Sequence, residues 1–164
     1  MDFSFSEEQL MIQNAAQEFA QQHCLPGVIE RDENQLFPKE QIKSLATLGF
    51  MGMMVDPKYG GSGLDTLSYV LAMEEISKVE ASVSVCMSVN NSLVCWGLEH
   101  FGNEEQKQRL LPRIAAGGIA SLAITEPHAG SDATGMKLSF TPDGDDIIVN
   151  GSKIFISNGD VADL

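Results

Sequence analysis

The sequence of 164 residues is poor in basic side chains, with ten lysines and arginines against 23 aspartates and glutamates, a formal net charge of −13. A negative charge of this size repels phosphate backbones and anionic lipid surfaces, which argues against a nucleic-acid-binding or membrane-surface protein. No uninterrupted apolar run reaches membrane-spanning length. The N-terminus also lacks the basic region of a secretory signal and the arginine-rich pattern of a presequence. We therefore expect a cytoplasmic protein that contacts neither nucleic acid nor membrane.

Cysteine is scarce as well. The three cysteines, Cys24, Cys86 and Cys95, are odd in number and show no metal-ligand spacing. A disulfide framework and a metal site are therefore not expected, and a reducing compartment is favoured. The hydrophobic share of 43% is ordinary for a globular protein and is sufficient to form a core.

The first two thirds of the chain show helical periodicity and helix-capping residues. Ser6 and Gln9 form a capping-box pattern, and apolar residues follow at helical spacing until Pro26. We expect helices beginning at Ser6, at Pro38, at Asp65 or Thr66, and at Asn103. The last of these should end at Leu110, and a separate short turn should run from Pro112 to Gly117 and Gly118.

Residues 81–101 allow two interpretations. Val83, Val85, Met87 and Val89 alternate with small or polar residues, which alone is typical of a strand. Cys86, Val89, Leu93 and Trp96 also fit one face of a helix, and the segment is much longer than a usual strand.

After Gly118 the residues favour short strands. We expect strands at 121–125, 137–141, 146–149 and 152–156, with a hairpin turn at Asn150-Gly151 between the last two. The chain thus divides into a helical domain, residues 1–118, and the beginning of a β domain, residues 119–164. Since these few strands leave a face to bury, we expect partner strands beyond Leu164.

Residues 123–135, AITEPHAGSDATG, form a polar loop of small residues after a β-prone lead-in. Gly130 permits close backbone approach, and neighbouring N–H groups are able to hold an anion such as a cofactor phosphate. An ordinary turn stabilised by Asp and Ser side chains explains the same composition. Glu126 and Asp132 are candidate acid/base residues, but carboxylates in such loops more often accept backbone N–H groups.

This loop resembles the first signature of the acyl-CoA dehydrogenases, flavoenzymes that oxidise acyl thioesters. Three further stretches resemble the same family in the same order, so the resemblance covers essentially the whole chain. They are residues 57–63, PKYGGSG; residues 101–107, FGNEEQK; and residues 150–159, NGSKIFISNG. The resemblance implies an α+β protein: an all-α N-terminal domain, in which residues 81–101 are helical, followed by the start of a β-barrel-like middle domain. The C-terminal helical domain of the family would lie outside this chain.

The resemblance also implies an FAD site. The family's cofactor contacts match Leu122, Ala123, Ile124, Thr125, Gly130, Ser131, Phe155, Ile156 and Ser157. Thr125 matches a residue that hydrogen-bonds the flavin ring, and Ser131 one that touches both cofactor and thioester substrate. Phe155 and Ser157 keep the aromatic ring and the hydroxyl that flavin stacking and a bond to flavin N5 require. Without the resemblance, Phe155 and Ile156 would be interpreted as core residues of a strand.

Residues 86–93 resemble most the short-chain, butyryl-type members. In that comparison Val85, Met87 and Val89 would line the acyl cavity, although such a stripe is more often core. No carboxylate here matches the family's catalytic base, so we expect no catalytic residue in this chain and the base beyond Leu164. The implied reaction is conversion of an acyl-CoA to its trans-2-enoyl-CoA. Electrons would pass to an electron-transfer flavoprotein, and the complete protein would be a homotetramer. The alternative is a non-catalytic helical binding module derived from this scaffold.

Overall fold

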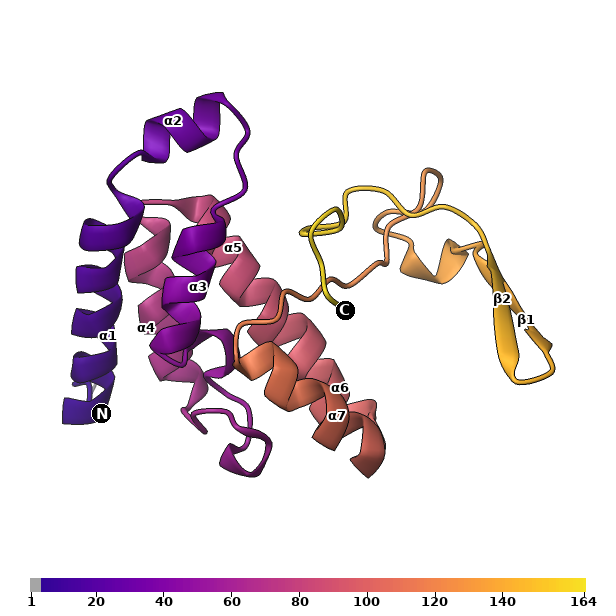
Figure 1. The fold of residues 1–164 in the computed structure, drawn as a ribbon, viewed down its shortest axis with the longest axis horizontal. Coiled ribbons are helices and arrows are strands. Elements are labelled where there is room, and N and C mark those ends of the chain that lie inside the picture. Colours follow the sequence, from indigo (N-terminus) through magenta and orange to yellow (C-terminus); the bar gives the residue numbers. More distant parts are fainter. Residues whose placement is uncertain (1–3) are drawn as a thin grey trace.

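The computed structural model describes residues 4–164 and consists of a helical body followed by an extended region that projects from it (Figure 1). The helices are α1 (Glu7–Phe19), α2 (Val28–Glu33), α3 (Lys39–Thr47), α4 (Thr66–Ser77), α5 (Ala81–Ser88), α6 (Trp96–Phe101) and α7 (Glu104–Ala115), and the strands are β1 (Ser139–Asp143) and β2 (Asp146–Asn150). The prediction of a helical N-terminal part followed by the beginning of a β domain is confirmed.

The helices begin where the capping residues predict. The Ser6 side chain accepts from the N–H of Gln9, whose side chain accepts in turn from the N–H of Ser6, which completes the capping box of α1. Asp65 caps α4 through the N–H of Ser68. Gly49 ends α3 with a φ of 76°, a left-handed conformation that glycine adopts without steric cost. The sequence did not predict α2.

The larger of two apolar core clusters joins the inward faces of α1, α3, α4 and α5. Its members include Phe19, Leu45, Met51, Ile76 and Met87, all of them buried. Such burial of large apolar side chains is the main favourable term in folding, so this cluster stabilises the helical body.

Residues 81–101 form one continuous helix, as the family resemblance implies, in which a π-helical stretch, Val89–Cys95, separates α5 from α6. In this stretch two adjacent side chains are buried. The Asn91 amide bonds to the Met53 N–H and to the Phe50 carbonyl, whereas the Asn90 amide bonds to the Gly118 carbonyl and to the Ala120 N–H. Asn90 therefore attaches the start of the extended region to the helical body.

The same helix, Ala81–Phe101, is long and apolar enough to cross a membrane by length and composition alone. Core helices of globular proteins pass the same test, and 44% of its most apolar stretch is buried within the protein. Its burial against α3 and α4 accounts for its composition.

The expected break at Pro112 is wrong, because α7 continues through Pro112 to Ala115. A proline in a helix forfeits one backbone hydrogen bond. Here Leu111, Ile114 and Ala115 are buried on one face, Leu111 and Ile114 in a second core cluster, and this burial favours continuation of the helix.

The expected hairpin at Asn150-Gly151 is also wrong. The hairpin joins β1 to β2 through Gly144-Asp145, with Asp143 opposite Asp146 and Ser139 opposite Asn150. Gly144 has a φ of 63° at the first central position of this two-residue turn, a conformation that glycine alone adopts readily. Within the described chain, residues 121–125 and 152–156 form no strand, and the second segment bends at Phe155, which has a φ of 55°.

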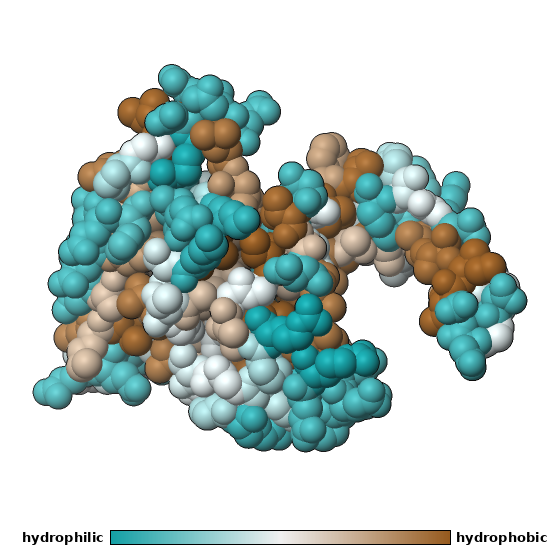
Figure 2. Space-filling view, viewed as in Figure 1, coloured by the Kyte–Doolittle hydropathy of each residue, from teal (hydrophilic) through white to brown (hydrophobic). Residues whose placement is uncertain are grey.

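One face of the hairpin is apolar and uncovered. Cross-strand pairs place Phe140 beside Val149 and Pro142 beside Ile147 on this face, and Phe140, Ile147 and Val149 are exposed. Figure 2 shows the hydrophobic surface on the projecting hairpin. Two strands alone rarely form a stable sheet in water, so this face is suited to packing against further structure.

Candidate functional site

Two segments that resemble the acyl-CoA dehydrogenases lie side by side in the extended region. The Ile154 N–H donates to the Thr125 carbonyl at 2.9 Å, and the Ser121 hydroxyl donates to the Ser157 carbonyl at 2.8 Å. The fold therefore brings the loop around Thr125 and the segment 153–157 to one place, although some thirty residues separate them in sequence.

Glu126 organises the loop. Its side chain is 2% exposed, and its carboxylate accepts from the N–H groups of Lys137 and Leu138 at 2.7 and 3.0 Å. Lys153 Nζ lies 2.9 Å from one carboxylate oxygen, and His128 Nε2 lies 3.2 Å from the other. The backbone N–H of Lys137, followed by the Lys153 ammonium, lowers the pKa of Glu126 to about 2.

This geometry agrees with the N–H-accepting interpretation of Glu126. A carboxylate with so low a pKa is a weak base, and each of its oxygens already has two partners. Asp132 also acts within its turn, where its carboxylate accepts from the Thr134 hydroxyl at 2.6 Å. His128 is an exposed loop residue, with 42% of its side chain accessible, and its Nε2 contacts the Glu126 carboxylate.

Three hydroxyl groups at this place have no protein partner. Within residues 4–164, the side-chain hydroxyls of Thr125, Ser131 and Ser157 make no hydrogen bond, and the N–H groups of Gly130 and Ser131 have no acceptor. A Cβ added at Gly130 would meet no atom within 4 Å, so space is open beside the loop. These free donors and this open space fit a ligand that carries phosphates and a polar ring.

Exposed apolar side chains occur on the same two segments as the hydroxyls. Leu122 and Ile124 are partly exposed, and Phe155 is 88% exposed with a φ of 55°, an uncommon conformation for a non-glycine residue. Strained residues of this kind cluster at functional sites. Cofactor sites typically combine apolar and aromatic side chains with a few polar donors, so the residues present fit the flavin of the predicted family.

The three residues predicted to line an acyl cavity do not share one environment. Val85 is 45% exposed, Met87 is completely buried in the core between α1, α3 and α4, and Val89 is buried. Residues two apart in a helix point in nearly opposite directions, so Val85 and Met87 face different sides. Val85 is the member that a ligand is able to reach.

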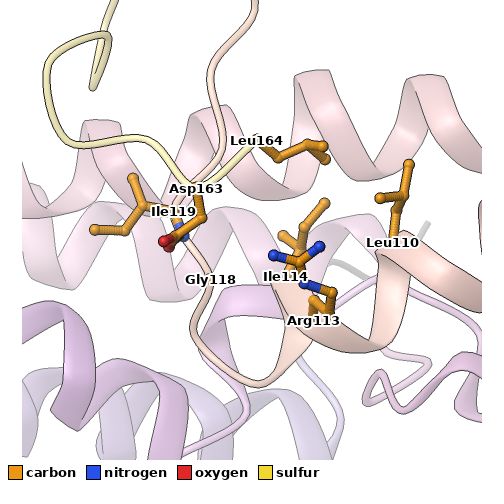
Figure 3. Close-up of a pocket in the computed structure, with 7 residues that line it drawn as sticks. All are labelled: Leu110, Arg113, Ile114, Gly118, Ile119, Asp163 and Leu164. Carbon is orange, nitrogen blue, oxygen red and sulfur yellow. Dashed lines mark hydrogen bonds between the residues drawn. The ribbon is translucent and has the colours of Figure 1, made fainter.

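A separate hollow of about 290 Å³ lies where the end of the chain returns to α7 (Figure 3). Leu110, Arg113 and Ile114 from α7 line it together with Ile119, Asp163 and Leu164, and the Asp163 carboxylate accepts from the Ile119 N–H. None of the predicted flavin contacts lines this hollow.

Comparison with known proteins decides the family. The family model described as the acyl-CoA dehydrogenase N-terminal domain matches residues 6–118, and the model of the acyl-CoA dehydrogenase middle domain matches residues 121–164. The chain belongs to the acyl-CoA dehydrogenase family. Its relatives bear the names of oxidoreductases.

The short-chain-specific acyl-CoA dehydrogenase of Clostridium acetobutylicum is 41% identical over 164 residues, which is 99% of this chain and 43% of that protein. The structure of butyryl-CoA dehydrogenase from Megasphaera elsdenii matches with a TM-score of 0.92 at 39% identity, over 99% of this chain and 44% of that one. The chain thus spans less than half the length of these relatives.

Two other similar structures are described with an electron transferring flavoprotein and with a bound flavin, FADH2. A structure described as an electron transferring flavoprotein of Acidaminococcus fermentans matches with a TM-score of 0.95 at 44% identity, over 99% of this chain and 43% of that one. A glutaryl-CoA dehydrogenase from Mycobacterium smegmatis in complex with FADH2 matches with a TM-score of 0.92 at 34% identity, over 97% of this chain and 41% of that one.

Sequence reasoning missed one residue of this site. Lys153 contacts Glu126, the Ile124 carbonyl and the Met136 sulfur, yet a lone lysine in a β-prone segment carries no signal of its own. Only the packing of segment 153–157 against the loop makes it visible.

Proposed function

We propose that this chain is part of an FAD-dependent acyl-CoA dehydrogenase that converts a short-chain acyl-CoA to the trans-2-enoyl-CoA. The observation that carries the proposal is the set of unpartnered hydroxyls, Thr125, Ser131 and Ser157, together on the two segments that resemble the family's flavin contacts. When bound, FAD supplies the acceptor for the hydride that leaves the β-carbon of the thioester.

The residues of this chain would bind and orient. Thr125 and Ser157 are placed to donate hydrogen bonds to the flavin ring, and the N–H groups of Gly130 and Ser131 are suited to a phosphate. Phe155 offers an aromatic surface to the ring, and Leu122, Ala123, Ile124 and Ile156 complete an apolar border. Ser131 would also contact the thioester, and Val85, the exposed member of the predicted stripe, would border the space for a short acyl chain.

The catalytic base is assigned outside residues 1–164. Glu126 directly follows Thr125, and its lowered pKa and its four partners make it unsuited to removing the α-proton of a thioester. The family's base matches no residue here, so the reaction needs the rest of the protein.

We further infer two domains, residues 1–118 and 119–164, an electron-transfer flavoprotein as acceptor and a homotetrameric complete protein. The last helix of the helical body ends at Ala115, and the two family models meet between residues 118 and 121. The similarity to a structure described as an electron transferring flavoprotein supports the acceptor. The tetramer rests on the family resemblance.

The test is anaerobic reduction of the full-length protein by butyryl-CoA, followed through the visible flavin band. We expect rapid bleaching by butyryl-CoA and slower bleaching by long-chain thioesters. Ser157→Ala should retain FAD, since one neutral hydrogen bond contributes about 1 kcal/mol, but should be reduced more slowly. Ser152→Ala, at an exposed residue whose side chain forms no hydrogen bond in the described chain, is the matched control.

A full-length protein that binds no flavin would contradict the proposal and favour the non-catalytic binding module. Flavin that no short acyl-CoA reduces would contradict the substrate class. If Ser157→Ala were reduced as fast as the unmodified protein, Ser157 would be removed from the flavin contacts.

A further inference from the structure

Lys153 connects the two segments that carry the proposed flavin contacts. Its Nζ donates to the Ile124 carbonyl at 2.7 Å, to Glu126 Oε1 at 2.9 Å and to the Met136 sulfur at 3.2 Å. An ammonium has three donors, and here all three have partners. With 16% of its side chain exposed, Lys153 is held inside the extended region rather than in solvent.

Glu126 completes the connection on the loop side. Its oxygens bind the N–H groups of Lys137 and Leu138, just before β1, and the Lys153 ammonium. Because the carboxylate is nearly inaccessible to water, loss of the ammonium would leave a buried negative charge with only two backbone N–H groups and His128 beside it. An uncompensated buried charge is among the larger penalties in a protein, so the pair strongly restricts the loop.

The Lys153–Glu126 ion pair lies next to the proposed flavin contacts in sequence, but neither residue is one of these contacts. Ile124 and Glu126 are the immediate neighbours of Thr125, and Lys153 precedes Phe155 by two residues and Ser157 by four. Along the loop, the Thr125 carbonyl, which accepts from the Ile154 N–H, lies between the two loop residues that Lys153 contacts, Ile124 and Glu126. Lys153 thus ties the loop that carries Thr125 to the segment that carries Ser157, together with the backbone bond from Ile154 and the Ser121 hydroxyl bond to the Ser157 carbonyl.

We infer that Lys153, through Glu126 and the Ile124 carbonyl, is a positioning residue of the FAD site. It holds the loop 121–135 and the segment 153–157 at the spacing that lets Thr125 and Ser157 bind one flavin ring. This inference rests on the proposed function, and it assigns to Lys153 no contact with flavin or substrate. A purely structural role would affect the stability of the extended region and leave the flavin environment unchanged.

The test uses the full-length protein with Lys153→Met, which keeps an unbranched apolar side chain and removes the charge. Lys39→Met is the matched control, because Lys39 is exposed and forms no ion pair in the described chain. The measurements are the FAD dissociation constant of the reconstituted apoprotein, the position of the visible flavin band, and hydrogen exchange of the Leu138 and Ile154 amides without flavin.

Lys153→Met should weaken FAD binding by at least about tenfold, the effect of losing a hydrogen bond between charged groups, and should shift the flavin band. The Leu138 and Ile154 amides should exchange faster. The double variant Glu126→Gln/Lys153→Met should lose less than the sum of the two single variants, because it removes both charges together. Lys39→Met should match the unmodified protein in every measurement.

An unchanged FAD dissociation constant and flavin band in Lys153→Met would overturn the inference, even if the variant were less stable. Unchanged exchange of the Leu138 and Ile154 amides would overturn it independently of any cofactor. If the unmodified protein bound no FAD, the proposed function would fail first, and the exchange measurement would still decide whether Lys153 holds the two segments together.

Discussion

Replacing Met87 by alanine should destabilise the helical body without changing chain-length preference. Met87 is completely buried among side chains from α1, α3 and α4. Truncation of such a residue removes buried methylene groups and leaves a cavity, and it typically costs about 2–5 kcal/mol. The matched variant is Val85→Ala, two residues away on the opposite, 45% exposed side of the same helix. Its cost in stability should stay below about 1 kcal/mol.

The same two variants should behave oppositely toward substrate. Val85 is open to a ligand, so Val85→Ala should shift the ratio of kcat/KM between butyryl-CoA and a longer thioester, by about 1–3 kcal/mol at most. Met87→Ala should leave this ratio unchanged. Stability is measured as the urea midpoint of the full-length protein by circular dichroism, and preference is measured with a set of acyl-CoA lengths.

One result would refute this reasoning: a Met87→Ala protein with the unmodified urea midpoint and an altered chain-length preference. Met87 would then line the acyl cavity, and the orientation of α5 in the helical body would be wrong. A Val85→Ala protein as unstable as Met87→Ala would likewise contradict the exposure of that face.

Three further predictions concern the described side chains. Asn90→Leu should lower the urea midpoint, because it leaves the half-buried Gly118 carbonyl and the buried Ala120 N–H without partners, and the buried N–H alone should cost about 1–3 kcal/mol. An unchanged midpoint would show that Asn90 does not attach the extended region. Burial, together with the charge of Glu80, raises the pKa of the Cys24 thiol to about 12, so iodoacetamide should label it in the native protein roughly a thousand times more slowly than a free thiol, and equal rates in native and unfolded protein would argue against its burial. Folding lowers the pKa of Glu126 from 4.5 to about 2, so its contribution to stability is complete above pH 4.5 and is lost as the pH falls toward 2. Glu126→Gln should therefore reduce the loss of stability between pH 4.5 and 2, and an unchanged loss of stability in this range would count against the buried carboxylate.

The helical half of the fold could be predicted because its signals are local. Ser6, Asp65 and Asn103 cap their helices through bonds to residues three positions away, and such spacing is visible in the sequence. Residues 81–101 show the limit of local periodicity, since alternating valines suggested a strand as readily as a helix. The family resemblance favoured helix there, and contacts with α3 and α4 explain why the helix is buried.

The β half was harder to predict because its pairing is not local. Asn150-Gly151 and Gly144-Asp145 both carry turn residues, and only the register that places Phe140 beside Val149 selects between them. The hydroxyls of the candidate site were predictable from the family signatures. Lys153 was not, because its role depends on three groups that lie between 17 and 29 residues away in sequence.

The most direct test of the central claim is the flavin content of the purified full-length protein, measured from the visible spectrum before and after denaturation in parallel with the protein concentration. If Thr125, Ser131 and Ser157 are the protein's flavin contacts, the protein should contain FAD in proportion to its chains, and the Thr125→Ala/Ser157→Ala variant should retain much less at an unchanged urea midpoint. A colourless full-length protein that also fails to take up added FAD, or a double variant that retains the full amount, would contradict the account.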